Sequence, residues 1–264
     1  MLRTTLNINA CLLWLWLLIF PGALLGDSGL RFYYFNPDSP QNNLGRLKSD
    51  MEMLLRDFSI SIEFQPFAHL NDFDQRVRED RPAFVFAPHW YLKRYVDELG
   101  FNPLLQAVRH QRNDYQKLLV SKRKGNSEFR KSGRKTLAMT SLGPDSKKLL
   151  SGILDASDLI DVDQVSIVEV PKDADAIFAA ALGQVDVALV TQTNLKLFKS
   201  INPKLIDSLR VYSDFTPVDM PVLGYLDGAV TKEQSDQLIK FILSSQDSTV
   251  MRTLQIDGWS DHAR

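Results

Sequence analysis

The amino-acid sequence predicts an α/β fold with two lobes, each a mostly parallel sheet flanked by helices. Short apolar runs alternate with amphipathic segments, which favours parallel strands covered by helices. This alternation occurs in two series along the chain, similar in plan but not in sequence. The 264 residues also leave room for two medium-sized domains, at about 100–200 residues per domain.

The first series runs from residue 30 to residue 99. Its opening run, Leu30–Phe35, is rich in aromatic residues and is typical of a buried strand. Apolar residues then recur at helical spacing from Leu44 to Leu55. The expected strands are Leu30–Phe35, Ile60–Phe64 and Ala83–Ala87, and the expected helices are Leu44–Phe58, His69–Glu79 and Tyr91–Leu99.

The second series begins after two linking strands, which we expect at Leu104–Val108 and Tyr115–Val120. Its expected strands are Thr136–Thr140, Val165–Val170 and Val185–Val190, and its helices are Asp145–Leu154, Ala174–Leu182 and one from Thr193. The remaining elements are strands at Leu209–Tyr212 and Pro221–Tyr225 and helices at Lys232–Leu243 and Ser248–Leu254.

The first 26 residues have the order of a secretory signal. A basic start at Arg3 precedes an uncharged run, Cys11–Phe20, and small residues then lead to Gly26. We expect cleavage after Gly26. An uncleaved inner-membrane anchor is the alternative, because Ile8–Leu25 approaches the ~18 apolar residues of a spanning helix. Either way, the sequence predicts a periplasmic location for the rest of the chain.

The composition excludes several functions. A net charge of -1 gives no basic excess for binding nucleic acid, and Cys11 is the sole cysteine. The four histidines do not have the spacing of metal ligands on a helix. The sequence lacks the Gly-x-Ser-x-Gly and Gly-x-Gly-x-x-Gly motifs. We therefore expect no enzyme activity, no metal and no cofactor.

Polar and aromatic residues follow four of the expected strands. Ligands of open α/β sheets bind at these carboxyl ends, although turn residues also cap helices when no ligand is present. Because the pattern occurs four times, it favours a ligand cleft. The four sets are Asn36, Asp38, Ser39 and Gln41; His89, Trp90 and Tyr91; Thr140, Ser141 and Gly143; and Thr191, Gln192 and Thr193.

Three segments carry a resemblance to a known family. They are Tyr115–Arg123 with Phe129–Ala138, then Phe84–Tyr91, then Leu182–Val190. In order and spacing they resemble periplasmic substrate-binding proteins of the type II fold, in particular the phosphate, phosphite and phosphonate binders of ABC transporters. The resemblance implies two lobes joined by two strands, with the ligand between them. Lobe one would hold residues 27–115 and 210–264, and lobe two residues 116–209, with crossings near Leu118–Lys122 and Leu209–Ser213.

The resemblance also implies a small anionic ligand. Hydroxyl groups and backbone N–H groups at a helix N-terminus suit a phosphate-like group. Thr191 stands where aminophosphonate binders offer a carboxylate, which disfavours an aminophosphonate. The predicted ligand-binding residues are Tyr34, Ser39, His89, Tyr91, Thr140, Ser141, Gly143 and Thr191.

The resemblance leads to two functional hypotheses. The first is a monomeric, extracytoplasmic solute-binding protein that delivers its ligand to an ABC permease. The second is a ligand-sensing domain that reports to a membrane signalling partner such as a histidine kinase. An uncleaved N-terminal anchor would favour the sensor, because a delivery protein must diffuse or be tethered by a lipid.

Overall fold

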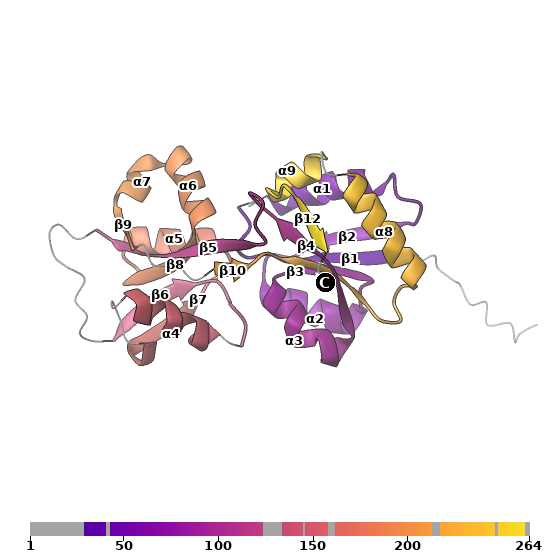
Figure 1. Cartoon of the computed structure of the whole chain (residues 1–264). Coiled ribbons are helices and arrows are strands. Elements are labelled where there is room, and N and C mark those ends of the chain that lie inside the picture. Colours follow the sequence, from indigo (N-terminus) through magenta and orange to yellow (C-terminus); the bar gives the residue numbers. More distant parts are fainter. Residues whose placement is uncertain are drawn as a thin grey trace, which may run out of the picture.

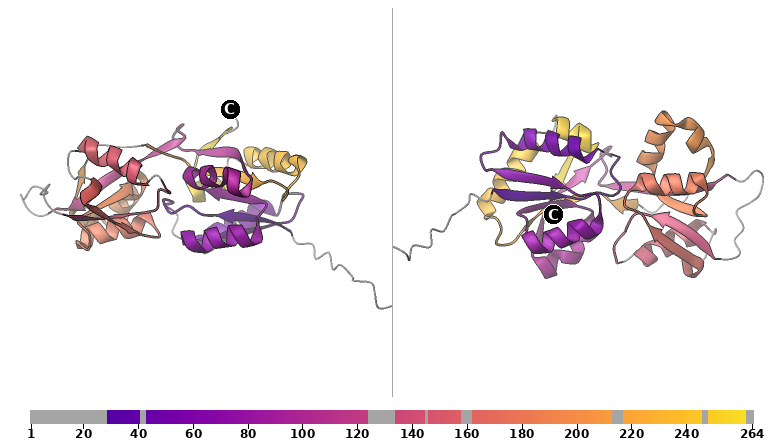
Figure 2. Two further views of the ribbon diagram at one scale, coloured as in Figure 1. Left: turned by 90° about the horizontal axis from the view of Figure 1, so that it is seen from below. Right: turned by 180° about the vertical axis from the view of Figure 1, so that it is seen from behind.

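The computed structural model describes residues 29–40, 43–123, 134–144, 146–157, 162–212, 217–245 and 248–261. Two α/β lobes lie side by side, as Figures 1 and 2 show from three directions. The predicted two-lobed fold is thus confirmed. The predicted signal segment and part of the stretch from Phe129 lie outside the described residues. No helix within these ranges has the length and hydropathy to cross a membrane.

Lobe one is built on a mixed sheet with the strand order β12-β4-β11-β3-β1-β2. Strands β1, β2 and β3 are parallel, whereas β11 runs antiparallel to both β3 and β4. The carboxyl ends of the parallel strands therefore meet at one edge of the sheet, facing lobe two. The strands are β1 (Leu30–Tyr34), β2 (Ile62–Pro66), β3 (Phe84–Ala87), β4 (Phe101–Val108), β11 (Val222–Leu226) and β12 (Gly258–Asp261).

Helices cover both faces of this sheet (Figure 1). The helices are α1 (Leu44–Leu55), α8 (Lys232–Ser244) and α9 (Thr249–Leu254) on one face, and α2 (Leu70–Asp80) and α3 (His89–Leu99) on the other. Because both faces are covered, the central strand β3 is apolar and buried along its whole length instead of alternating. Phe84 and Phe73 are fully buried in the two resulting cores, where each contributes about 1.5–3 kcal/mol relative to an exposed side chain.

Lobe two repeats the plan with the strand order β10-β5-β8-β6-β7, and β9 also pairs with β5. Helices α5 and α6 pack on one face and α4 on the other. The strands are β5 (Asp114–Lys122), β6 (Lys135–Met139), β7 (Val165–Glu169), β8 (Val187–Thr191), β9 (Leu209–Tyr212) and β10 (Pro217–Asp219). The helices are α4 (Ser146–Ser157), α5 (Asp173–Leu182), α6 (Gln192–Ile201) and α7 (Pro203–Asp207), with a 3₁₀ turn at Val162–Gln164.

Two segments connect the lobes, one between β4 and β5 and the other between β10 and β11. They are hydrogen-bonded to each other, since the Met220 N–H donates to the Asn113 carbonyl oxygen at 2.8 Å. The buried Gln106 side chain donates to the carbonyl oxygens of both Asn113 and Met220, at 3.2 and 3.4 Å. Side-chain and backbone hydrogen bonds therefore join the two connections.

Both connections differ in position from those that the resemblance implies, near Leu118–Lys122 and Leu209–Ser213. Leu118–Lys122 lie within β5, where they pair with β8 and β9, so the first connection falls before Asp114. Both β9 and β10 pair with β5, so that the second sheet extends to Asp219. Strand β5 is long enough to accept both partners along its length, which local apolar patterns do not reveal. The short elements α7, β10 and β12 were also not predicted.

Candidate functional site

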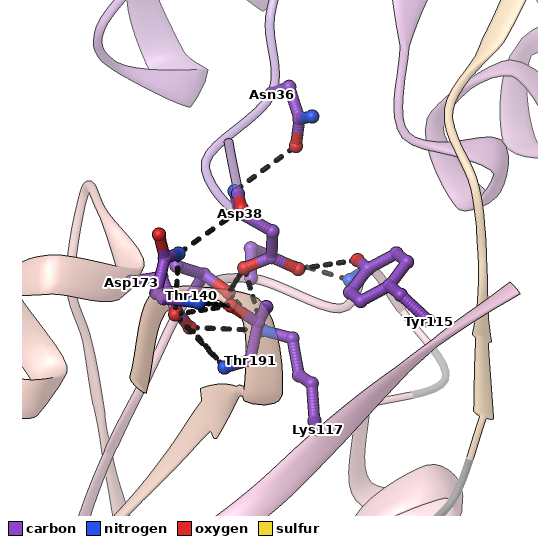
Figure 3. Close-up of polar contacts among 10 residues, drawn as sticks. Asn36, Asp38, Tyr115, Lys117, Thr140, Asp173 and Thr191 are labelled. Carbon is purple, nitrogen blue, oxygen red and sulfur yellow. Dashed lines mark hydrogen bonds and ion pairs between the residues drawn. The ribbon is translucent and has the colours of Figure 1, made fainter. Parts of the chain in front are cut away.

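A buried polar cluster lies between the lobes, at the carboxyl ends of the parallel strands (Figure 3). Asp38 enters from the loop after β1, and Lys117 from β5. Thr140 follows β6, Asp173 begins α5 and Thr191 ends β8. All five side chains are buried. The cluster is therefore assembled from both lobes and from the strand that enters lobe two.

The carboxylate of Asp38 is held by three donors. Its Oδ1 accepts hydrogen bonds from Lys117 Nζ at 2.8 Å and from Thr140 Oγ1 at 2.6 Å. Its Oδ2 accepts from the Tyr115 hydroxyl at 2.5 Å. Burial raises the pKa of Tyr115 well above its ordinary value, and the nearby Asp38 charge adds to this effect. The phenol is therefore a stable donor at neutral pH.

The Lys117 ammonium is the positive centre of the cluster. Its side chain is fully buried and lies 2.8 Å from Asp38 and 3.9 Å from Asp173. Nζ also donates to Thr140 Oγ1 at 2.6 Å. Burying an ammonium group is costly unless it is paired and hydrogen-bonded. Both conditions are met here, which makes the lysine a fixed point for negative charge.

The second carboxylate, Asp173, is bound mainly by lobe two. It accepts hydrogen bonds from the backbone N–H and the hydroxyl of Thr191, both at 2.9 Å to Oδ2, and from Asn194 Nδ2 at 2.8 Å. Burial raises the pKa of Asp173 to about 6. The positive charge of Lys117 lowers this pKa, and the negative charge of Asp38 raises it. Asp173 therefore titrates closer to neutrality than an ordinary aspartate.

The loop that carries Asp38 is itself docked on lobe two. The Pro37 carbonyl oxygen accepts the Asp173 N–H at 3.0 Å, and the Asp38 carbonyl oxygen accepts Asn194 Nδ2 at 3.3 Å. Within the loop, Asn36 Oδ1 accepts the Asp38 N–H at 3.1 Å. The cluster thus joins the lobes through backbone contacts as well as through side chains.

Three of the residues predicted from sequence lie in or beside this cluster. Thr140 and Thr191 belong to it, and Ser39 follows Asp38 in the docked loop. Tyr34 is buried in lobe one, where burial raises its pKa to about 12 and its phenol interacts with Ser39 and Asn36. Tyr34 therefore supports the base of the loop.

Ser141 and Gly143 lie on the turn that follows Thr140. The Ser141 hydroxyl accepts the Gly143 N–H at 3.4 Å, so this amide points back into its own turn. Gly143 has φ of 81°, and a Cβ added there would lie 2.6 Å from Cε3 of Trp90. The turn is thus pressed against the indole of lobe one, and the structure does not bring Ser141 or Gly143 onto the Asp38 carboxylate.

Tyr91 lies away from the cluster. Its hydroxyl donates to Asp74 Oδ1 at 3.0 Å on the neighbouring helix α2. Burial and the Asp74 charge raise the pKa of this phenol well above its ordinary value. Helix α3 begins at His89, so the helical repeat directs Tyr91 into the lobe-one core instead of toward the strand end.

His89 lines a second, open feature between the lobes. A groove of about 390 Å³ is bordered by α3, α4 and β10. Its lining includes His89, Trp90, Lys93, Lys148 and Asp219. The His89 Nδ1 lies 2.6 Å from the Asp219 carboxylate, with both side chains partly exposed to solvent. Within the described ranges, no group of histidine, cysteine and carboxylate side chains is placed to hold a metal ion.

The sequence reasoning missed Lys117, Asp173, Tyr115 and Asn194 as site residues, and it named Asp38 only as a strand-end residue. The sequence did contain an indication for one of these residues, Lys117. Lys117 is a lysine within the largely apolar run Tyr115–Val120, where a charge needs a buried partner. That partner is 79 positions away in the sequence, so the local pattern could not identify it.

Residues 33–263 match the family model described as the periplasmic substrate-binding protein of phosphonate ABC transporters. The chain belongs to this family, whose members bind substrates for transport and are not enzymes. No curated protein matches the chain.

Solved structures share the fold. A binding-protein component of an ABC phosphonate transporter from Pseudomonas aeruginosa has a TM-score of 0.70 and 16% identity, covering 88% of this chain and 80% of that one. A Prochlorococcus marinus protein in complex with methylphosphonate has a TM-score of 0.70 and 11% identity, covering 88% and 92%. A histidine kinase sensor domain is similar at a TM-score of 0.53 and 13% identity, covering 81% and 88%. At these identities the similarity establishes the type II periplasmic-binding fold.

Proposed function

We propose that this protein captures a small oxyanion between its lobes outside the cytoplasm and delivers it to an ABC permease. One observation carries the proposal. Lys117, Thr140 and Tyr115 together bind a carboxylate at distances of 2.5–2.8 Å in a buried site between the lobes. The three donors recognise negatively charged oxygen atoms, and nothing in their chemistry restricts them to the Asp38 side chain that they hold here.

The donor set indicates the class of ligand. An ammonium group and two hydroxyls suit the oxygen atoms of a phosphate, phosphonate or sulfate group. The membership of the phosphonate transporter family supports the same class. The related Prochlorococcus marinus structure holds methylphosphonate, which makes this compound the natural first probe.

A thermal-shift titration of the mature chain tests the proposal. A ligand that binds only the folded state raises its stability, by about 2.7 kcal/mol at a hundred times Kd. We expect phosphate, phosphite, sulfate or methylphosphonate to raise Tm at millimolar concentration. An unchanged Tm with all four compounds would overturn the proposal.

Two variants test where the anion binds. Thr140→Val removes a hydroxyl that contacts the carboxylate while keeping the shape of the side chain, and we expect it to weaken binding about tenfold. Ser141→Ala is the matched control, because its hydroxyl bonds to the Gly143 amide and not to the cluster. Equal losses in both variants would place the anion elsewhere.

The second candidate function is a sensor domain, and it is favoured by the similarity to the histidine kinase sensor domain. Cell fractionation of the full-length protein separates the two functions. A delivery protein is released by osmotic shock, whereas a sensor stays with the membrane fraction until detergent is added.

A further inference from the structure

We propose that Asp38 is a built-in ligand: its carboxylate occupies the oxyanion site and holds the lobes together until a solute displaces it. The inference rests on the proposed function for the identity of the solute, but the role of Asp38 in closing the lobes can be tested without any solute. Its basis is the position of one side chain relative to three donors from other parts of the chain.

The coordination of Asp38 is that of a bound anion. Both carboxylate oxygen atoms accept charge-assisted or short hydrogen bonds, from Lys117, Thr140 and Tyr115 (Figure 3). The side chain is 7% exposed and the ammonium is fully buried. The donors belong to β5 and to the end of β6, whereas Asp38 belongs to the loop after β1. The carboxylate therefore reaches from lobe one into a site built by other elements.

The charges of the cluster make Asp38 and a solute anion mutually exclusive. Two carboxylates, Asp38 and Asp173, surround the Lys117 ammonium. The nearby Arg109 guanidinium donates to the carbonyl oxygens of Leu254 and Gln255 and to the Thr193 hydroxyl instead of to the cluster. A third negative group beside one ammonium would be repelled in a buried site. An oxyanion can enter only when Asp38 leaves.

Leaving the site also separates lobe-one atoms from lobe-two atoms. The Pro37 and Asp38 carbonyl oxygens accept hydrogen bonds from Asp173 and Asn194 of lobe two, through the same loop as the carboxylate. Withdrawal of the side chain therefore loosens the backbone contacts as well. The form that accepts a solute is one in which the loop 36–39 has moved away from α5 and α6.

This competition sets the specificity of the site. A solute must replace a carboxylate that already accepts hydrogen bonds from all three donors, so another carboxylate gains little from the exchange. A phosphate or phosphonate group offers at least three acceptor oxygen atoms where a carboxylate offers two, so each donor can bind an oxygen of its own. Asp38 thus acts as a specificity-determining residue that favours tetrahedral oxyanions over carboxylates.

The experiment uses the mature chain with Asp38→Ala, Asp38→Asn and, as a matched control, Asp236→Ala on the exposed face of α8. Calorimetric titration is carried out with formate, acetate, phosphate and methylphosphonate. We expect Asp38→Ala to bind formate or acetate, which replace the missing carboxylate, and to bind phosphate or methylphosphonate at least tenfold more tightly than the wild type. Asp38→Asn keeps the size of the side chain and covers the case in which the alanine variant does not fold.

Small-angle scattering of the unliganded proteins gives an independent readout. We expect a larger radius of gyration for both Asp38 variants than for the wild type and for Asp236→Ala. Unchanged scattering together with unchanged carboxylate binding would overturn the inference. Opening of the lobes and formate binding without any phosphate or methylphosphonate binding would support the role of Asp38 and overturn the proposed function instead.

Discussion

Among the described residues, the Lys117–Asp38 ion pair and the His89–Asp219 contact both lie between the lobes, and they differ chiefly in burial. Lys117 and Asp38 are 0% and 7% exposed at 2.8 Å, whereas His89 and Asp219 are 26% and 58% exposed at 2.6 Å. The contact distances are nearly equal, so distance does not distinguish the pairs. Removing one member of a buried pair strands a charge in a dry site, while water replaces the missing partner at the surface. The buried cluster should therefore dominate the stability of the closed form.

The largest effect is expected from Lys117→Met. The substitution leaves Asp38 and Asp173 without their cation, which costs about 3–5 kcal/mol in a buried site. Urea unfolding of the variant and the wild type measures the difference. Lys122→Met changes an exposed lysine of the same strand and should remain within about 0.5 kcal/mol. If Lys117→Met and Lys122→Met lowered the unfolding free energy by similar amounts, burial would not decide how much each lysine contributes to stability.

The next effect concerns pH and Asp173. Its folded-state pKa of about 6 exceeds the ordinary value of 3.8, so between these values the folded state holds a proton that the unfolded state has released. The contribution of this group to stability therefore falls as pH rises from about 4 to about 6, and it is constant above that window.

Urea unfolding at several pH values between 4 and 7 tests this trend. The difference in unfolding free energy between the wild type and Asp173→Asn should become less favourable to the wild type as pH rises through the window. The titratable groups that interact with Asp173 are Lys117, Asp38 and Tyr115, and both the wild type and Asp173→Asn keep all three. A difference that is independent of pH would show that Asp173 has an ordinary pKa.

A smaller effect is expected from Gly143→Ala, on the turn of lobe two that packs against Trp90 of lobe one. The residue has φ of 81°, and the new Cβ would lie 2.6 Å from the Trp90 ring, so the variant should lose about 1–3 kcal/mol. Gly152→Ala is the control, because open space surrounds that position on α4 and alanine favours a helix by up to about 1 kcal/mol. Thermal unfolding that ranks the two variants in the opposite order would contradict this packing.

The smallest effect is expected from Asp219→Asn at the open groove. The pair with His89 is solvated, and such pairs contribute about 0–1 kcal/mol. In urea unfolding, the change in unfolding free energy caused by Asp219→Asn should be much smaller than that caused by Lys117→Met. A loss as large as that of Lys117→Met would mean that the groove, and not the buried cluster, holds the lobes together.

Much of the fold could be predicted because burial on both faces gives continuous apolar strands. The runs at Phe84–Ala87 and Val187–Thr191 are unambiguous, and the rule for strand ends located Thr140 and Thr191. Short strands such as Pro217–Asp219 could not be predicted, since their identity depends on the partner β5 and not on their own residues.

The site was less predictable than the fold for a related reason. Asp38 was visible as a turn residue, and turns carry aspartate whether or not a ligand exists. Its role depends on an ammonium from β5 and a hydroxyl from the end of β6. Tyr91 shows a different difficulty, because it lies near a strand end as predicted but the helical repeat directs its hydroxyl toward Asp74. Long-range pairing and side-chain direction are set by tertiary structure.

The bonded connections between the lobes have a mechanical consequence. Because Met220 bonds to Asn113 and Gln106 holds both strands, the two connections form one ribbon and not two independent tethers. Such a ribbon resists sliding of one strand along the other but allows the pair to bend or twist together. Any separation of the lobes is therefore restricted to a narrow set of rotations. When the lobes close again, the loop of Asp38 would return to the same position against lobe two.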